Sequence, residues 1–204
     1  MSTLENIPLI NGLILAGGKS TRMGQDKAAL VYDGRTQLAR AVGTLKIFTP
    51  NFFISCREEQ RTFVQKILGE VNFITDKKEF VHIGPLGGIL SAQSAFVHEA
   101  WLVLACDLPF VTEETLNFLI QNRDAQKVAT AYRSTYDGLP EPLCAIWEPR
   151  SLAITQDFFK KGIQCPRKIL KNSDTHLLEP PNKHWLDNVN TPEEFKKAQE
   201  ELNR

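Results

Sequence analysis

The sequence lacks the features by which disulfide-stapled, zinc-binding and nucleic-acid-binding proteins are recognised. Its four cysteines form no Cys-x-x-Cys pair, and its four histidines lie apart, without the spacing of metal ligands. Lys plus Arg and Asp plus Glu number 24 each, so no bulk charge draws the chain to nucleic acid or to a membrane surface. We therefore expect reduced, buried thiols, and any bound anion must be held by local groups.

The first residues also lack the signs of a secretory or membrane segment. No basic stretch precedes the apolar run Leu9–Ala16, which is interrupted by Asn11 and Gly12 and is too short to span a bilayer. No internal repeat, low-complexity run or linker is visible, and the 42% of hydrophobic residues is ordinary for a globular enzyme. We expect a cytoplasmic chain with no membrane partner and a single domain over residues 1–204.

What the sequence does contain is an alternation of short apolar runs and segments with helical periodicity. Trp101–Cys106 is apolar at every position, as a strand covered on both faces requires. The other expected strands are Leu9–Leu15, Asn51–Ser55, Val71–Thr75, Val128–Tyr132 and Leu143–Trp147, the last two being candidates for antiparallel pairing. The expected helices are Glu58–Leu68, Leu86–Val97, one capped by Thr112 that runs to Asn122, and one capped by Thr191. This order predicts an α/β fold, a Rossmann-like three-layer sandwich with a mainly parallel sheet.

A glycine-rich basic segment follows the first expected strand, in the string Leu15-Ala-Gly-Gly-Lys-Ser-Thr-Arg-Met-Gly-Gln-Asp-Lys27. Gly17 and Gly18 let backbone N–H groups approach an anion closely. The segment carries one acid, Asp26, and three cations, which are Lys19, Arg22 and Lys27. Ligands of such sheets bind beyond the carboxyl ends of the strands, and a triphosphate suits amides and cations on one loop. The alternative is a solvated loop with chance lysines.

Two other phosphate-binding motifs are excluded by spacing. Gly18-Lys19-Ser20 imitates the end of a P-loop, but the position that needs the first glycine of that motif is Leu13. The glycines of the segment also fail the Gly-x-Gly-x-x-Gly spacing of dinucleotide-binding folds. The segment is therefore a nucleotide-binding candidate of another type.

A carboxylate at the end of the central strand is the candidate metal ligand. Asp107 closes the buried run Leu104–Cys106 and faces the same crevice as the glycine segment. Its hard oxygen atoms suit Mg²⁺, which would bridge nucleotide phosphates and neutralise charge during transfer. The alternative is an Asp-x-Pro turn in which the aspartate only caps the exit of the chain. Because the glycine segment lies nearby, we favour the interpretation of Asp107 as a metal ligand.

Three further segments are candidate ligand contacts. Gly84, Pro85 and Leu86 open a helix and could place a base or ribose against backbone groups, the alternative being close helix–sheet packing. Asp76 could accept a hydrogen bond from a guanine edge or a sugar hydroxyl, or be an exposed loop acid. Two further residues, Asn188 and Asn190, point to the same face of an extended chain. They could contact an acceptor or phosphate, or form turn hydrogen bonds.

Together these motifs resemble one family, the molybdenum cofactor guanylyltransferases. The string that ends at Lys27 is similar to the signature Leu-Ala-Gly-Gly-x-Ser-x-Arg-Met-Gly-x-Asp-Lys at nearly every position. The resemblance continues through Gly84–Gly88, Cys106–Pro109, Glu141–Pro142 and Asn188–Glu194, and so covers nearly the whole chain. It implies a nucleotidyltransferase fold that transfers GMP from GTP to the terminal phosphate of the molybdopterin cofactor, with Mg²⁺ as cofactor and pyrophosphate as product.

Carried over to the matching positions, the resemblance implies which residues form the site. The expected nucleotide contacts are Leu15, Ala16, Gly17, Gly18, Lys27, Asp76 and Asp107, with Asp107 also on the metal. The groups expected to stabilise the transition state are Lys19, Arg22, Lys27 and Asp107. Cys56 stands where the family often has asparagine, which puts a contact by that side chain in doubt, and Arg57 is a candidate acceptor contact.

The resemblance also sets the expected partners and the competing functions. GTP and the molybdopterin acceptor are the expected substrates, with transient contact to cofactor-biosynthesis or molybdoenzyme-maturation proteins. The nearest competing function is a cytidylyltransferase for the same cofactor, which shares the glycine segment. A competitor of another class is a GTP-binding carrier or regulator without catalysis.

Overall fold

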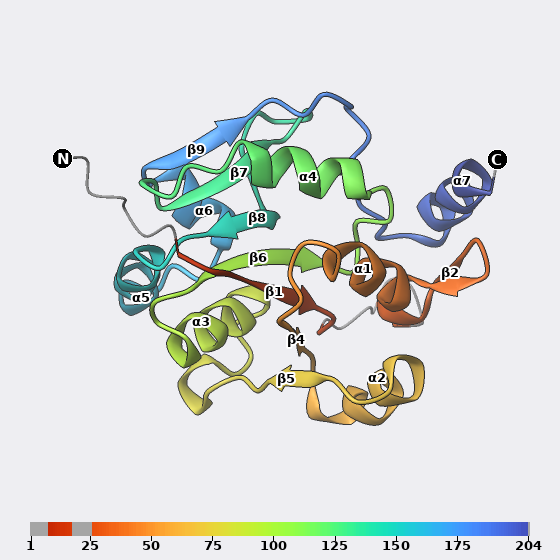
Figure 1. Ribbon diagram of the computed structural model, residues 1–204, viewed down its shortest axis with the longest axis horizontal. Helices are drawn as coiled ribbons and strands as arrows, with labels where there is room; N and C mark the ends of the chain where they lie inside the picture. The colour runs from red at the N-terminus through yellow and green to blue at the C-terminus, as the bar shows by residue number, and fades with distance from the viewer. Residues whose placement is uncertain (1–7, 18–25, 204) are drawn as a thin grey trace.

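A seven-stranded sheet forms the centre of the computed structural model, which describes residues 8–17 and 26–203 (Figure 1). The strands lie in the order β5-β4-β1-β6-β8-β7-β9. Their bounds are β1 Ile10–Leu15, β4 Phe52–Ser55, β5 Asn72–Ile74, β6 Ala100–Ala105, β7 Ala129–Arg133, β8 Pro140–Trp147 and β9 Thr175–Leu178. Neighbouring strands are parallel except that β8 runs antiparallel to β6 and β7. The predicted mainly parallel sheet with an antiparallel part is confirmed.

Helices cover both faces of the sheet and complete the predicted three layers (Figure 1). One face packs against α1 (Gln37–Leu45), α2 (Arg61–Leu68) and α4 (Glu113–Gln121). The other face packs against α3 (Pro85–Ala95), α5 (Ser151–Lys160) and α6 (Pro166–Lys171). Successive side chains of a strand point to opposite faces, so Leu13 and Ile14 of β1 enter different hydrophobic clusters. A strand covered in this way has to be apolar throughout, as β6 is.

The predicted helix caps are present. Thr112 caps α4, accepting a hydrogen bond from the N–H of Thr115. At the start of α7 (Pro192–Leu202), Thr191 Oγ1 accepts from the N–H of Glu194 at 3.2 Å, and Glu194 Oε2 accepts from the N–H of Thr191 at 3.1 Å. This reciprocal pair satisfies amide groups that a helix leaves unpaired at its first turn. Short polar side chains therefore set where these helices begin.

Some boundaries differ from the sequence predictions. β8 begins at Pro140 and not at Leu143, because Pro140 and Glu141 pair with Arg133 and Tyr132 of β7. A proline, which has no N–H, is tolerated at the first position of a strand. Its ladder to β7 shifts register between Ala131 and Tyr132. The predicted helix Glu58–Leu68 starts as a 3₁₀ turn, η2 (Glu58–Gln60), before α2. The prediction that all cysteines are buried holds for Cys106 and Cys144 but is wrong for Cys56, which is half-buried, and for Cys165, which is exposed just before α6.

The three tryptophans lie in the interior. Trp101 and Trp147 are fully buried, and Trp185 is 4% exposed. Trp185 packs against Phe118 and Tyr132, at ring-centroid distances of 6.2 and 6.0 Å. Within residues 8–17 and 26–203, no helix has both the length and the apolar character that crossing a membrane requires.

Candidate active site

The carboxyl ends of β4, β1 and β6 lie side by side at one edge of the sheet. Leu15, the last residue of β1, pairs with Ser55 of β4 and with Ala105 of β6. Main-chain hydrogen bonds continue past the strands: the N–H of Ala16 donates to Ser55 O at 2.9 Å, and the N–H of Cys106 donates to Leu15 O at 3.2 Å. The residues that leave these strands are thereby gathered where ligands of α/β sheets bind.

Three polar side chains meet just beyond β6. Lys27 Nζ lies 3.3 Å from Asp107 Oδ2 and 2.5 Å from Asn190 Oδ1. The side chains of Lys27 and Asp107 are 22% and 26% exposed, so solvent and ligands can reach the pair. The structure thus brings together a predicted cation, the predicted metal ligand and one predicted asparagine. We call these three residues the Lys27 cluster.

The chain before α7 is attached to the end of β6. The N–H of Val189 donates to Asp107 O at 3.0 Å, and the Val189 side chain is buried. The two asparagines flank this buried residue, but their surroundings differ: Asn190 is half-buried and bonds to Lys27, whereas Asn188 is exposed. The structure therefore distinguishes two residues that the sequence treated alike.

Lys27 is placed by a short 3₁₀ helix, η1 (Lys27–Ala29). Asp26 caps it, because Asp26 Oδ1 accepts from the N–H of Ala28 at 3.0 Å. Sequence reasoning counted Asp26 only as the acid of the basic segment, although an aspartate before a Lys-Ala-Ala turn is a capping signal. Gly18, Lys19 and Arg22, which were also assigned to phosphate binding, lie outside the described residues.

A small hydrophobic cluster stands behind Lys27 and Asn190. It joins α7 to the hairpin β2 (Val31–Tyr32) and β3 (Arg35–Thr36) and to the chain that follows Asp107. Its members are Leu30, Tyr32, Val189 and Ala198, with Phe110, Phe195 and Leu202 packed against them. The Tyr32 and Phe195 rings meet edge to face at a centroid distance of 5.1 Å. Sequence reasoning did not foresee this cluster, which supports both ends of the Lys27–Asn190 contact.

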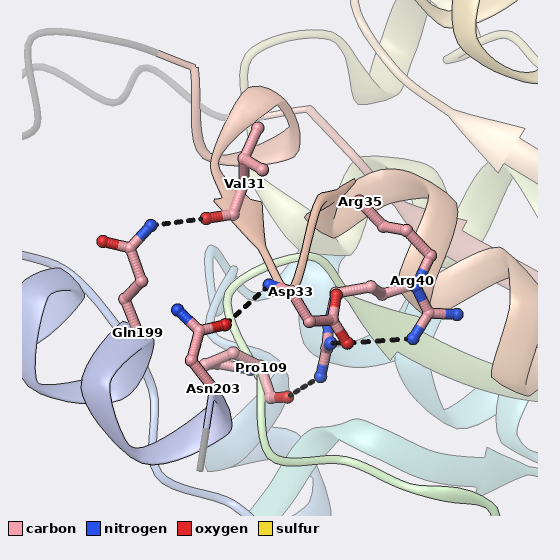
Figure 2. Close-up of polar contacts among 7 residues, drawn as sticks. All are labelled: Val31, Asp33, Arg35, Arg40, Pro109, Gln199 and Asn203. Carbon is pink, nitrogen blue, oxygen red and sulfur yellow. Dashed lines mark hydrogen bonds and ion pairs between the residues drawn. The ribbon is translucent and has the colours of Figure 1, made fainter.

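Polar contacts reinforce the same junction (Figure 2). The N–H of Asp33, in the hairpin turn, donates to Asn203 Oδ1 of the chain just after α7 at 3.1 Å. Arg40 of α1 pairs with the Asp33 carboxylate and donates to Pro109 O at 3.3 Å. The hairpin follows η1 directly, and α7 follows the 188–190 segment directly. Docking of the hairpin on α7 therefore fixes both segments relative to the end of β6.

A pocket of about 760 Å³ opens beside the same strand ends, on the side of β4 and β5. Its size is in the range of small-molecule and cofactor sites. Its wall includes the predicted contacts Leu15, Gly17, Asp76, Gly84 and Pro85, together with Cys56 and Arg57. Leu86, also predicted as a contact, is fully buried in the core behind this wall. The pocket thus joins the start of the glycine segment to the opening of α3.

Glycines in the first turn of α3 permit close packing behind the pocket. A Cβ on Gly87 would lie 2.4 Å from Phe80 O and 2.9 Å from Asp76 Oδ2, and one on Gly88 would lie 2.4 Å from Ser55 Oγ. These distances are too short for any side chain. The packing explanation therefore holds for Gly87 and Gly88, which lets Asp76 approach the start of the helix.

The pocket wall is poorly hydrated at two titratable groups. Burial raises the pKa of the Asp76 carboxyl above its ordinary value. Burial also raises the pKa of the Cys56 thiol to about 11, against the weaker opposing effect of Arg61. Cys56 is therefore a neutral thiol at neutral pH. The Asp76 carboxyl is half-buried in the pocket wall.

Comparison of the chain with known proteins identifies its family. Residues 12–177 match the family described as the MobA-like NTP transferase domain. The chain belongs to this family. Membership confirms the predicted nucleotidyltransferase fold, and relatives named molybdenum cofactor guanylyltransferase confirm the predicted resemblance.

Relatives of this MobA-like chain differ in how much of their own length it covers. It is 29% identical to the molybdenum cofactor guanylyltransferase of Campylobacter jejuni subsp. doylei, over 95% of this chain and 97% of the relative. It is 34% identical to the molybdenum cofactor biosynthesis bifunctional protein of Synechocystis, over 90% of this chain, but spans about half, 52%, of that relative. The fold is that of the crystal structure of molybdopterin-guanine dinucleotide biosynthesis protein A from Archaeoglobus fulgidus, with TM-score 0.76, 24% identity, and coverage of 95% of this chain and 98% of that one.

Nucleotidyltransferases generally use a divalent metal, and the donor set of the Lys27 cluster fits one. Asp107 and Asn190 direct a carboxylate and an amide oxygen at a common cation, the Lys27 ammonium. In the described part of the chain there is no group of three or more His, Cys, Asp or Glu residues able to hold a metal. Mg²⁺ is usually held by one or two carboxylates plus substrate phosphates, so it needs no complete protein cage.

Proposed function

We propose that this chain transfers GMP from GTP to the terminal phosphate of the molybdopterin cofactor, giving the guanine dinucleotide and pyrophosphate. Relatives matched over nearly their full length carry the name molybdenum cofactor guanylyltransferase, which supports this substrate pair. The observation that carries the proposal is the presence of a nucleotide-sized pocket and the Lys27 cluster at the ends of adjacent strands. We also propose that residues 1–204 act as one domain.

In this proposal the nucleotide lies across the carboxyl end of β1. The base and ribose occupy the pocket, where Asp76 accepts a hydrogen bond and Gly84 and Pro85 offer backbone groups. The triphosphate passes the backbone of Leu15–Gly17 toward Lys27. The strand order supports this direction, because β1 lies between β4, which borders the pocket, and β6, which ends two residues before Asp107.

Charge determines the chemistry. An acceptor phosphate oxygen attacks the α-phosphorus of GTP, the bond from that phosphorus to the bridging oxygen breaks, and pyrophosphate leaves with the electron pair. The acceptor is already ionised at neutral pH, so no general base is required. Catalysis then depends on alignment and on stabilising the anionic transition state. Lys27 supplies part of that stabilisation, and we assign Lys19 and Arg22 the same task.

Mg²⁺ would be held by Asp107, with Asn190 beside it. When bound, the ion would neutralise charge on the phosphates and orient them. Lys27, which now bonds both residues, would turn its ammonium to the phosphate oxygen atoms. Asp107 and Asn190 would then contact the Lys27 ammonium when no ion is bound and Mg²⁺ when it is. Each makes a single contact with Lys27, which such an exchange of partners requires.

The test is incubation of the protein with molybdopterin, Mg²⁺ and each nucleoside triphosphate in turn, with pyrophosphate release as the readout. We expect release with GTP, and mass spectrometry should find the guanine dinucleotide. Turnover with CTP in preference to GTP would identify a cytidylyltransferase. GTP binding without pyrophosphate release would identify a carrier or regulator, and either result would overturn the proposal. Contact with cofactor-biosynthesis or molybdoenzyme-maturation proteins is a further proposal, to be tested by co-purification.

A further inference from the structure

A buried glutamine connects the pocket wall to the segment that carries Lys27. Gln60, the last residue of η2, is 5% exposed. Its Nε2 donates to Ala16 O at 3.2 Å and to the Asp26 carboxylate. Its Oε1 accepts from the main-chain N–H of Arg57 at 3.0 Å and from Arg57 Nε at 3.3 Å. The sequence analysis assigned no role to Gln60.

All four hydrogen-bonding positions of the Gln60 amide are used. A primary amide has two N–H donors and one oxygen with two lone pairs. Both donors meet oxygen atoms, of Ala16 and Asp26, and both lone pairs meet N–H groups of Arg57. The two sides of the amide are therefore distinguished by their partners, and an ionised glutamate could not replace the donors. A buried network of this kind is rigid when it is complete.

The partners of Gln60 are the groups that set the position of Lys27. Ala16 is the first residue after β1, and Asp26 is the cap of η1, immediately before Lys27. Through its one amide, Gln60 fixes the start of η1 relative to the end of β1. Through Arg57 it ties both to the wall of the pocket. A shift of the Asp26 cap would move the ammonium away from Asp107 and Asn190.

We propose that Gln60 is a positioning residue, which holds Lys27 at the carboxyl end of β6 through Asp26. Only its effect on turnover rests on the proposed function; its effect on the Lys27 side chain does not. Arg57, the other partner of this amide, lines the pocket. Positioning errors of about 1 Å can cost about 100-fold in rate, so a contact two residues removed from the substrate is sufficient for a large effect.

The test uses Gln60→Met, which keeps the length of the side chain and removes its hydrogen bonds. A matched control is Gln93→Met, because Gln93 is equally buried, at 2% exposed, but bonds Ser151 between α3 and α5. We expect Gln60→Met to lower the pyrophosphate-release kcat about 10- to 100-fold per folded molecule. Gln93→Met should lose thermal stability and keep kcat. Equal kcat for Gln60→Met and wild type would overturn the proposal.

A second readout needs no substrate. The rate of Lys27 acetylation by trace acetic anhydride, measured by peptide mass spectrometry, should rise severalfold in Gln60→Met and stay at the wild-type rate in Gln93→Met. An unchanged rate in Gln60→Met would reject the positioning role. If wild type releases no pyrophosphate with any triphosphate yet the acetylation rate responds to Gln60→Met, the proposed function fails and the positioning role stands.

Exchanging the amide of Gln60 and the carboxylate of Asp26 between the two positions should restore part of the lost activity. Gln60→Glu places two carboxylates together and should lower kcat in the same way as Gln60→Met. Adding Asp26→Asn restores a donor–acceptor pair, because the new amide can donate to the new carboxylate while its oxygen still caps Ala28. We expect the double variant to recover at least severalfold over Gln60→Glu. A double variant no better than Gln60→Glu would show that this contact does not carry the effect.

Discussion

Two ion pairs at opposite ends of the sheet differ in a way that separates stability from function. Arg123 and Glu148 form two parallel bonds of 2.7 Å, with side chains only 9% and 0% exposed, and Arg123 also donates to Pro8 O at 2.9 Å. Lys27 and Asp107 make one contact of 3.3 Å, and both remain open to solvent.

The difference shows what each pair is suited to do. A bidentate, desolvated guanidinium–carboxylate pair is fully used within the protein, so it has no capacity left for a ligand. A lysine that contacts a carboxylate at one point can exchange that partner for a phosphate. Loss of the first pair should therefore affect mainly stability, and loss of the second mainly catalysis.

Breaking the Arg123–Glu148 pair should have the largest effect in free energy. Arg123→Met leaves the fully buried Glu148 carboxylate without its partner, and such a loss costs about 3–5 kcal/mol of unfolding free energy. Urea denaturation should measure it. The kcat of the folded fraction should match wild type; a large fall in kcat with intact stability would reverse the assignment of the two pairs.

Removing a charge from the Lys27 cluster should affect catalysis. Asp107→Ala or Lys27→Ala should lower the transfer rate on the order of 100-fold or more, since each removes a stabiliser of the transition state. The unfolding free energy should change by about 1 kcal/mol or less, because the pair is partly exposed. Steady-state kinetics beside denaturation would decide. A rate within a few-fold of wild type would reject the assignments of both residues.

The two asparagines should separate in a smaller effect. Asn190→Ala removes an oxygen atom 2.5 Å from Lys27 Nζ and should lower kcat about tenfold, the cost of one charge-assisted hydrogen bond. Asn188→Ala, its matched control, alters an exposed side chain and should leave kcat nearly unchanged. If both variants lost activity equally, the asparagines would share the acceptor contact that the sequence left open.

The smallest effect concerns Cys56. Its pKa of about 11 keeps it a thiol near neutral pH, so alkylation by iodoacetamide should be slow and should rise about tenfold per pH unit below that value. The exposed Cys165 is the internal reference. GTP should slow alkylation of Cys56 severalfold and leave Cys165 unaffected, as read by peptide mass spectrometry. Equal protection of both cysteines would argue against nucleotide in this pocket.

The sequence predicted those parts of the molecule that depend on local signals. β6 was identifiable from its unbroken apolar run, α7 from its capping box, and Asp107 from its position at the end of a strand. The helices α1, α5 and α6 and the strands β2, β3 and β9 were not predicted. The apolar residues Leu38, Ala41, Val42 and Leu45 of α1 do have helical spacing, so this helix was within reach of the sequence, whereas β9 is a short segment, Thr175–Leu178, that contains a threonine and a histidine.

The site was predictable only in part because two of its contacts depend on the complete fold. Lys27 and Asn190 are separated by 163 positions in the chain, so no local spacing indicates that they meet. Gln60 lies 44 positions from Ala16 and 34 from Asp26. A buried glutamine has no sequence signature of its own, and its role becomes visible only when both partners are placed.

The Lys27–Asn190 contact also makes the proposed ligand site depend on the complete fold. Because its two halves are 163 positions apart in the sequence, an intermediate that lacks either half would lack the complete cluster, and a nucleotide bound as we propose would bind the native state alone. By mass action, a ligand at 100 times its dissociation constant adds about 2.7 kcal/mol to the unfolding free energy. Because binding would require the complete fold, this increase in unfolding free energy would apply to the entire sheet. The supply of substrate would then affect how long the folded protein persists.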